Sequence, residues 1–135
     1  MKTVRDLLDH IRFSDLEIKS LMALRDRLGA RALAINSSLS ERVSGSKNLD
    51  GMYSIVDDYV ELEKVIDEKL KILTDAKKIA LNNINRLNNP LQRVILIERY
   101  FNGESWKSIS IIIGRSEKWA KQTHDKAIKL CEING

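Results

Sequence analysis

Basic and amide side chains recur at helical spacing near the end of this sequence. Lys121 and Gln122 follow Lys118 by three and four residues, which places all three on one face of a helix. An ammonium group binds phosphate oxygens or the acceptor atoms of guanine, and a glutamine amide can pair its donor and acceptor with adenine. This face therefore predicts non-covalent contact with the backbone and base edges of duplex DNA.

The predicted contact surface extends beyond this face. Arg115 and Ser116 come directly before the helix, where unpaired backbone N–H groups can hold a phosphate, and Ser116 is also placed to cap the helix. Glu117 lies in the positive first turn. The full set of predicted DNA-contact residues is Lys107, Arg115, Ser116, Glu117, Lys118, Lys121, Gln122 and Lys126. The alternative is that these are ordinary solvated residues of a small helical domain.

Two short helices and a glycine turn are expected to position this surface. Ser105 is placed to cap the first helix, in which Trp106, Ile109 and Ile113 share one face. Gly114 can take a positive φ and so end that helix. The inner face of the second helix is predicted to comprise Ala120, Thr123, Ala127 and Leu130.

A helix, a glycine turn and a second helix with an apolar inner face and a basic outer face form the pattern of a helix-turn-helix. The stretch resembles the end of a sigma-70 region 4 domain and the phage regulators built on it, the ArpU/RinA-type late-gene transcriptional activators. The matching segments are residues 96–101, 106–110, 113–116, 121–122 and 126–128, in the C-terminal part of the chain. The resemblance implies a transcriptional regulator whose second helix enters the major groove.

The composition favours long helices over a β-sandwich. Of the 135 residues, 43% are hydrophobic, 31% are charged, 5% are aromatic and one is proline. The net charge is +4, and most of the positive excess lies from residue 91 onward. Such a distribution suits a nucleic-acid partner, although a solvated helix face would have the same charges.

Two long helices are predicted before the basic region. Thr3 is placed to cap the first, and Ser14 with Glu17 resembles a capping box at which a new helix, or the same one kinked, would start. Gly29 indicates a local bend or a close approach of another helix. The apolar seam of this part is Leu21, Leu24, Leu28, Ala32, Ile35 and Leu39.

Residues 44–51 lack periodicity and contain two glycines, so we expect a loop in which Asp50 caps the next helix. That helix should run from about residue 52 to about residue 87. Its seam is Val56, Tyr59, Leu62, Ile66, Leu70, Leu73, Lys77, Ala80, Ile84 and Leu87, within which Lys77 would either snorkel or set the register of an oligomer. A helix of this length needs a partner, either the preceding helix or a second copy of the chain.

A domain boundary is expected where asparagines crowd the end of this helix. Asn89 as N-cap and Pro90 at the first helical position would start a support helix over residues 91–101. The predicted fold class is all-α: a long antiparallel helical hairpin over residues 1–88, followed by a three-helix helix-turn-helix head over residues 89–135. The hairpin would serve oligomerisation or partner binding, and the head would lean on it near Ile84 and Leu87.

No motif in the sequence predicts catalysis. It has no glycine-rich phosphate loop, no nucleophile elbow and no histidine pair at zinc-ligand spacing, so we expect neither an enzyme nor a cofactor or metal. His124 is expected to be a surface or cap-neighbouring histidine rather than a metal ligand. Trp106 is expected in the core, whereas Trp119 would either pack on the support helix or touch a thymine methyl group. Cys131 is the only cysteine, which excludes an intrachain disulfide and predicts a buried thiol in a reduced compartment.

The sequence also bears on location. No apolar run approaches the ~20 residues needed to span a bilayer, and acidic residues interrupt any signal-peptide core, so the expected location is the cytosol. The resemblance to phage regulators implies that this is the cytosol of a bacterial host.

The leading functional hypothesis is a phage or prophage sequence-specific DNA-binding transcriptional regulator. It would bind double-stranded DNA, and RNA polymerase is a further candidate partner. It would act as a homo-oligomer, for which a dimer is favoured. One alternative is a small terminase-like DNA-packaging subunit. Another is an adaptor that binds polymerase without a DNA specificity of its own.

Overall fold

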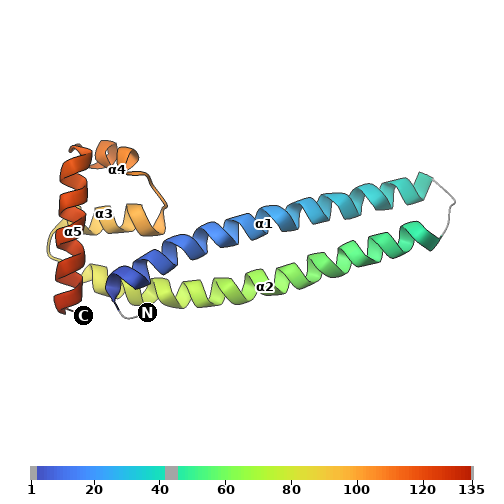
Figure 1. Cartoon of the computed structure of the whole chain (residues 1–135), viewed down its shortest axis with the longest axis horizontal. Helices are drawn as coiled ribbons and strands as arrows, with labels where there is room; N and C mark the ends of the chain where they lie inside the picture. Colours follow the sequence, from blue (N-terminus) through green and yellow to red (C-terminus); the bar gives the residue numbers. More distant parts are fainter. Residues whose placement is uncertain (1–2, 42–45, 135) are drawn as a thin grey trace. The chain divides into compact units, whose positions relative to one another are not determined.

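The computed structural model describes residues 3–41 and 46–134, and within these ranges the regular structure is entirely helical. Figure 1 shows the order of the elements: α1 (Val4–Glu41), α2 (Ser46–Asn85), α3 (Pro90–Leu96), the π-helical turn η1 (Ile97–Phe101), α4 (Trp106–Ile113) and α5 (Glu117–Asn134). The predicted all-α class is therefore confirmed. The two long N-terminal helices pack together, as the sequence predicts.

The chain forms two compact units. The first comprises the described residues up to 15 and those from 72 onward, and the second comprises residues 16–71. Each long helix thus contributes residues to both units, and the units are described separately. The predicted division of function at residue 88 stays a prediction.

Helix α1 begins where the sequence predicts, but it is not interrupted at the predicted second start. Thr3 Oγ1 accepts a hydrogen bond from the backbone N–H of Asp6 at 3.0 Å, which is the predicted cap. The prediction that a new helix starts at Ser14 is wrong, because α1 continues through it to Glu41. The Ser14 hydroxyl lies 3.5 Å from Nδ1 of His10, one turn earlier on the same helix.

The start of α2 lies earlier than predicted. The helix begins at Ser46, so the predicted loop over 44–51 is helical from that residue onward, while Ser44 and Gly45 lie outside the described residues. Asp50 lies inside the helix and therefore is not its cap. An interior glycine such as Gly51 costs only about 1 kcal/mol, which a long and cooperatively formed helix tolerates. The end at Asn85 is two residues before the predicted one.

In the second unit, α1 and α2 run antiparallel. Lys69 pairs with Glu17 at 3.0 Å and Arg25 approaches Glu63 at 4.0 Å, so later residues of α2 face earlier residues of α1. Ile18 and Ile66 are buried between the helices.

Most of the predicted seam positions whose side chains the structure describes face inward, and the side chain of Leu39 lies outside that description. Leu24 is 45% exposed, so its assignment to the seam is wrong, whereas Val56 is 39% exposed but lines an open hollow between the two helices. An α-helix has 3.6 residues per turn, so positions taken at alternating steps of three and four residues gradually rotate around the helix. The side chain next to Leu24, Arg25, is the less exposed of the two.

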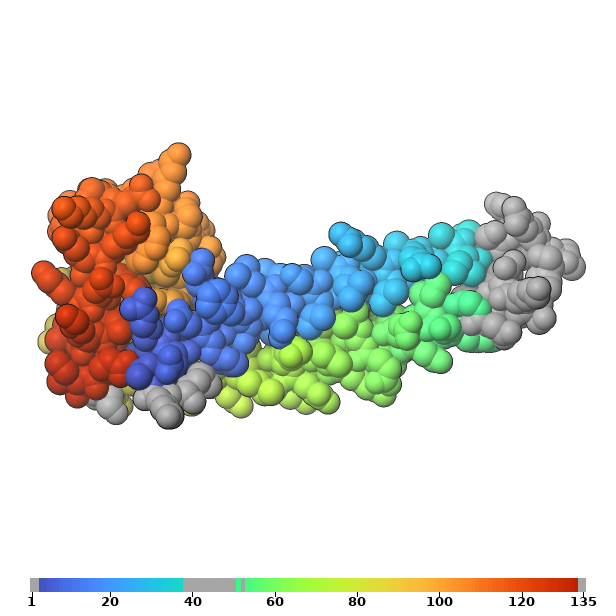
Figure 2. Space-filling view, in the orientation of Figure 1, coloured from blue at the N-terminus to red at the C-terminus, as the bar shows by residue number. Residues whose placement is uncertain are grey.

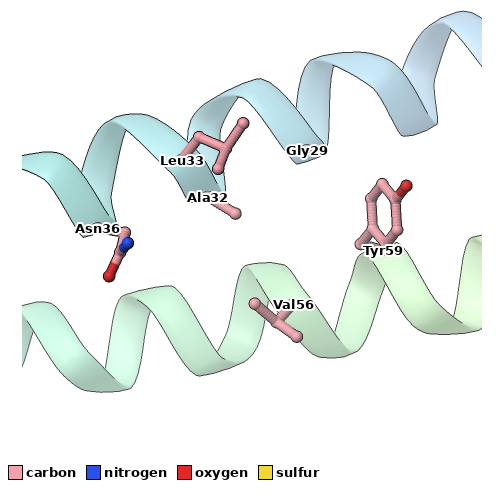
Figure 3. A pocket seen from close by; sticks show the side chains of 6 residues that line it. All are labelled: Gly29, Ala32, Leu33, Asn36, Val56 and Tyr59. Atoms are coloured by element: carbon pink, nitrogen blue, oxygen red, sulfur yellow. The ribbon is translucent and has the colours of Figure 1, made fainter.

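Gly29 marks a close approach of the two helices, as predicted. A Cβ at this position would lie 3.2 Å from the ring of Tyr59. Beside this contact is a mainly apolar hollow of about 400 Å³, which Figure 3 shows between the two helices. Its lining residues are Gly29, Ala32, Leu33, Asn36, Val56 and Tyr59.

The first unit joins the start of α1 and the end of α2 to the three C-terminal helices. Ile84 and Leu87 are buried, as predicted. Cys131 Sγ lies 4.0 Å from the Asn83 carbonyl, and Arg93 Nη1 donates to the carbonyl of Leu87 at 2.6 Å. Lys77 extends to within 3.9 Å of Asp15, so this seam lysine forms an ion pair within the chain.

Candidate nucleic-acid interface

The support helix starts as the sequence predicts. Asn89 has extended backbone angles, and its side-chain oxygen accepts from Leu91 N at 2.9 Å and from Gln92 N at 3.4 Å, with Pro90 in the first turn. Over Ile97–Phe101 the helix widens into a π-helical turn. Tyr100 in this turn is buried, whereas a surface position is common for a tyrosine.

The next helix, α4, is fixed by a cap and an apolar face. Ser105 Oγ accepts from the backbone N–H of Ser108 at 3.1 Å. Trp106 and Ile113 pack, together with Trp119, on the buried cluster of Ile95, Ile109 and Ala120. The predictions for Ser105, for the apolar face and for Trp106 are confirmed, and Trp119 packs inward rather than standing clear of the core.

Gly114 ends α4 in the left-handed region, with φ of +67°. This is the backbone conformation that the glycine predicts. The following helix is capped by Ser116, whose hydroxyl oxygen accepts from the backbone N–H of Trp119 at 3.1 Å. The chain therefore turns from α4 into α5 within three residues.

The inner face of α5 is confirmed at three of four positions. Ala120, Thr123 and Ala127 are buried, but Leu130 is 40% exposed and its assignment to the inner face is wrong. Cys131 takes that place, because residues 120 and 131 are eleven positions apart, close to three full turns of an α-helix. The predicted buried thiol is thus confirmed, and burial raises the pKa of Cys131.

The eight predicted DNA-contact residues are all exposed. Lys118, Lys121 and Gln122 lie on the side of α5 opposite Ala120 and Ala127. Figure 2 shows the side chains of α4 and α5, orange to red, as one continuous surface. The exposed residues of the set are Lys107, Arg115, Ser116, Glu117, Lys118, Lys121, Gln122 and Lys126.

Two isoleucines of α4 are also exposed. Ile111 is 73% exposed and Ile112 is 52% exposed. Neither isoleucine was predicted to be exposed, although one face of a helix cannot bury all three isoleucines of the run 111–113.

His124 differs from its prediction. It is 4% exposed, not at the surface, and its Nε2 lies 2.6 Å from the hydroxyl oxygen of Tyr100. Burial is the main cause that lowers the pKa of His124. The available signal was its position between Ala120, Ala127 and Cys131, at steps of four, three and four residues along one helix face.

Metal ligands, membrane-spanning helices and known relatives were each sought. Over residues 3–41 and 46–134, no three potential ligand side chains gather as they would around a metal ion. None of the helices described is both long and apolar enough to cross a membrane. No protein-family model matches the chain, and no curated protein or solved structure matches it either.

Proposed function

We propose that this chain is a sequence-specific DNA-binding protein in which α4, the Gly114 turn and α5 form a helix-turn-helix. The observation that supports this most directly is the division of α5 into two faces. One face buries Ala120 and Ala127, and the other exposes Lys118, Lys121 and Gln122. In a helix-turn-helix the exposed face of the second helix is the one that enters the major groove.

The start of α5 supports a phosphate contact beside this groove-reading face. The first backbone N–H groups of a helix are directed at its N-terminal end and favour an anion. Arg115 and Ser116 are exposed there, and Lys107 is exposed on α4. Phosphate contacts at these positions would fix the register of α5, while Lys121 and Gln122 would read base edges.

The proposed biological role is transcriptional regulation in a phage or prophage, which follows from the resemblance to sigma-70 region 4 and the ArpU/RinA-type activators. A homodimer would place two copies of α5 on paired half-sites. Apolar side chains that remain exposed on the long helices support oligomerisation, among them Leu33 at 70% and Ile72 at 60%. Light scattering would test this, since a monomer at working concentration contradicts it.

Fluorescence anisotropy, which measures binding to genomic duplex fragments across a salt series, tests the proposed function. We expect fragment-selective binding that is lost when Lys118, Lys121 and Gln122 are all replaced by alanine. Each phosphate contact that is removed should reduce the slope of log K against log salt by about 0.9. Substitution of Lys64 and Lys71, two exposed lysines of α2, by alanine is the control for charge. Equal loss in the control and the triple variant would contradict a specific interface.

The exposed Ile111 and Ile112 favour the polymerase-binding adaptor as a second candidate, because an exposed apolar pair on a short helix suits a protein partner. Replacement of both by serine should then abolish capture of RNA polymerase and leave DNA binding unchanged. The small terminase-like subunit predicts a large ring in solution, which the same light-scattering measurement would reveal.

A further inference from the structure

Two buried polar side chains join α5 to the π-helical turn. Tyr100 and His124 are each 4% exposed, and Oη of Tyr100 lies 2.6 Å from Nε2 of His124. Their rings are stacked with centroids 5.6 Å apart. The ring of Trp106 meets His124 edge-on at 5.1 Å. Three elements, η1, α4 and α5, therefore converge on one imidazole.

The partners of this imidazole define where its proton lies. Nδ1 of His124 lies 2.9 Å from Oδ1 of Asp125, and a carboxylate can only accept hydrogen bonds. Nδ1 must therefore hold the hydrogen, and the bare Nε2 accepts the hydroxyl hydrogen of Tyr100. Burial, with the Asp9 carboxylate adding to it, raises the pKa of Tyr100 to about 12, so this hydroxyl remains a donor at neutral and mildly acidic pH.

A second proton on His124 would disrupt this arrangement. It would occupy Nε2 and turn this nitrogen into a donor to the Tyr100 oxygen, so that the buried hydroxyl hydrogen of Tyr100 would lose its acceptor. The charged groups that face the pair are Asp125 of α5, Arg99 of η1, and Arg5, Asp9 and Arg12 of α1. Asp125 favours the charged imidazole, but burial disfavours it more strongly and Arg5 and Arg99 add to that effect.

The same helix bears the proposed contact surface. Lys121 and Gln122 precede His124 by three and two residues and are exposed, while His124 is buried beneath them. Since α5 is one continuous helix over Glu117–Asn134, a rotation or shift of the helix at His124 moves both side chains. Readout by side chains requires placement to within about 0.5 Å, so even a small displacement of α5 would weaken binding.

We propose that His124 is a positioning residue for DNA binding: its neutral imidazole, bonded to Tyr100, holds α5 in place, and its protonation releases α5 and weakens the complex with DNA. This inference rests on the proposed function. It also predicts the direction in which the DNA affinity changes with pH. One more positive charge would by itself strengthen attraction to phosphates, whereas loss of positioning weakens binding as the pH falls.

The test is the dissociation constant for the selected duplex between pH 7.5 and pH 5.5 at constant ionic strength. For the unaltered chain we expect binding to weaken as the pH falls, by up to about fivefold once His124 carries the second proton, the size of effect that one lost buried hydrogen bond produces. Circular dichroism at each pH restricts the comparison to conditions in which helicity is unchanged. The control is His10→Gln, which removes the other histidine and should leave both affinity and pH profile unchanged.

Two variants remove the proposed coupling. His124→Gln cannot be protonated and should bind more weakly at pH 7.5 but lose the pH dependence. Tyr100→Phe removes one oxygen atom, keeps the ring, and should also weaken binding and flatten the profile, which provides a second route if the glutamine variant does not fold. Binding that tightens or stays constant as the pH falls, or a pH dependence that both variants retain, would overturn the inference.

Nuclear magnetic resonance separates this inference from the proposed function. The nitrogen shifts of His124 should report a hydrogen on Nδ1 at neutral pH, and protonation should make amide exchange in α5 faster relative to the intrinsic exchange rate at the same pH. If no duplex is bound at any pH, the proposed function fails. Protonation of His124 without faster relative amide exchange in α5 would overturn the positioning role whether or not DNA is bound. If DNA binds with no pH effect, only the positioning role fails.

Discussion

The guanidinium carbon of Arg99 lies 4.7 Å from the centre of the Trp106 ring, and Nη1 of the same arginine donates to the Glu104 carbonyl at 3.1 Å. One side chain thus holds the end of the π-helical turn, the connecting loop and the first residue of α4 together. Because Trp106 also packs on the buried cluster around Ile109, Arg99 fixes the entry of the chain into α4.

Replacement of Arg99 by alanine should lower the free energy of unfolding by roughly 2 kcal/mol, about half from the cation–π contact and half from the hydrogen bond. Arg99→Lys should lose less, because an ammonium retains part of the cation–π attraction. Urea denaturation, monitored by Trp fluorescence, measures the free energy of unfolding of both variants. Arg115→Ala is the matched control, since Arg115 lies 5.4 Å over Trp119 but is exposed, and a loss as large as that of Arg99→Ala would contradict the argument.

Ser116 allows capping to be separated from DNA contact. Ser116→Ala should cost about 1 kcal/mol of stability, because the backbone N–H of Trp119 loses its acceptor. Ser116→Asp should keep the cap, and with it the stability, yet weaken DNA binding by placing a negative charge where a phosphate is proposed. Thermal unfolding and anisotropy measured on the same samples decide this, and unchanged DNA affinity of the aspartate variant would exclude a phosphate at the start of α5.

The two glycines Gly114 and Gly29 should respond in opposite ways to alanine. Gly114→Ala has open space for its Cβ but must adopt φ of +67°, which costs roughly 1–2 kcal/mol. Gly29→Ala places its Cβ 3.2 Å from the Tyr59 ring, which borders the open hollow and can shift by a few tenths of an ångström. The gain in helix propensity of about 1 kcal/mol should then prevail. A lower melting temperature for Gly29→Ala would show that the Tyr59 ring is held in place.

The buried His124 predicts a dependence of stability on pH. Its pKa in the folded chain lies below the ordinary value of 6.5, mainly because burial disfavours the charged form. Above pH 6.5 neither state binds the proton, so His124 adds no pH dependence. As the pH falls below 6.5 the unfolded chain binds the proton first, and the free energy of unfolding should fall by at most about 1.4 kcal/mol per pH unit until the folded-state pKa is reached.

Urea midpoints at intervals from pH 7.5 to pH 5 measure this effect, with His124→Gln as the comparison because glutamine does not titrate. The difference in slope between the two chains between pH 6.5 and pH 5 isolates the contribution of His124. Parallel profiles would contradict a lowered pKa of His124 in the folded chain.

The sequence alone determined those features that depend on residues within one helical turn of each other. Thr3, Asn89, Ser105 and Ser116 cap the helices that they were expected to cap, and Gly114 adopts a positive φ. These outcomes are local because a cap needs only a side-chain oxygen and a backbone N–H two or three residues later. The exposure of the predicted contact residues follows from the same short-range spacing.

The tertiary structure decided which side of each helix is buried. It also decided at which residues a prediction from local sequence fails. Leu130 and Leu24 repeat at helical spacing but stay exposed, while His124 is buried because Tyr100 supplies a partner 24 residues away in sequence. The residues from Ser46 to Gly51 join α2 although their types favour a loop. In each case the deciding free energy comes from packing and hydrogen bonds between distant segments, which residue types and their spacing do not contain.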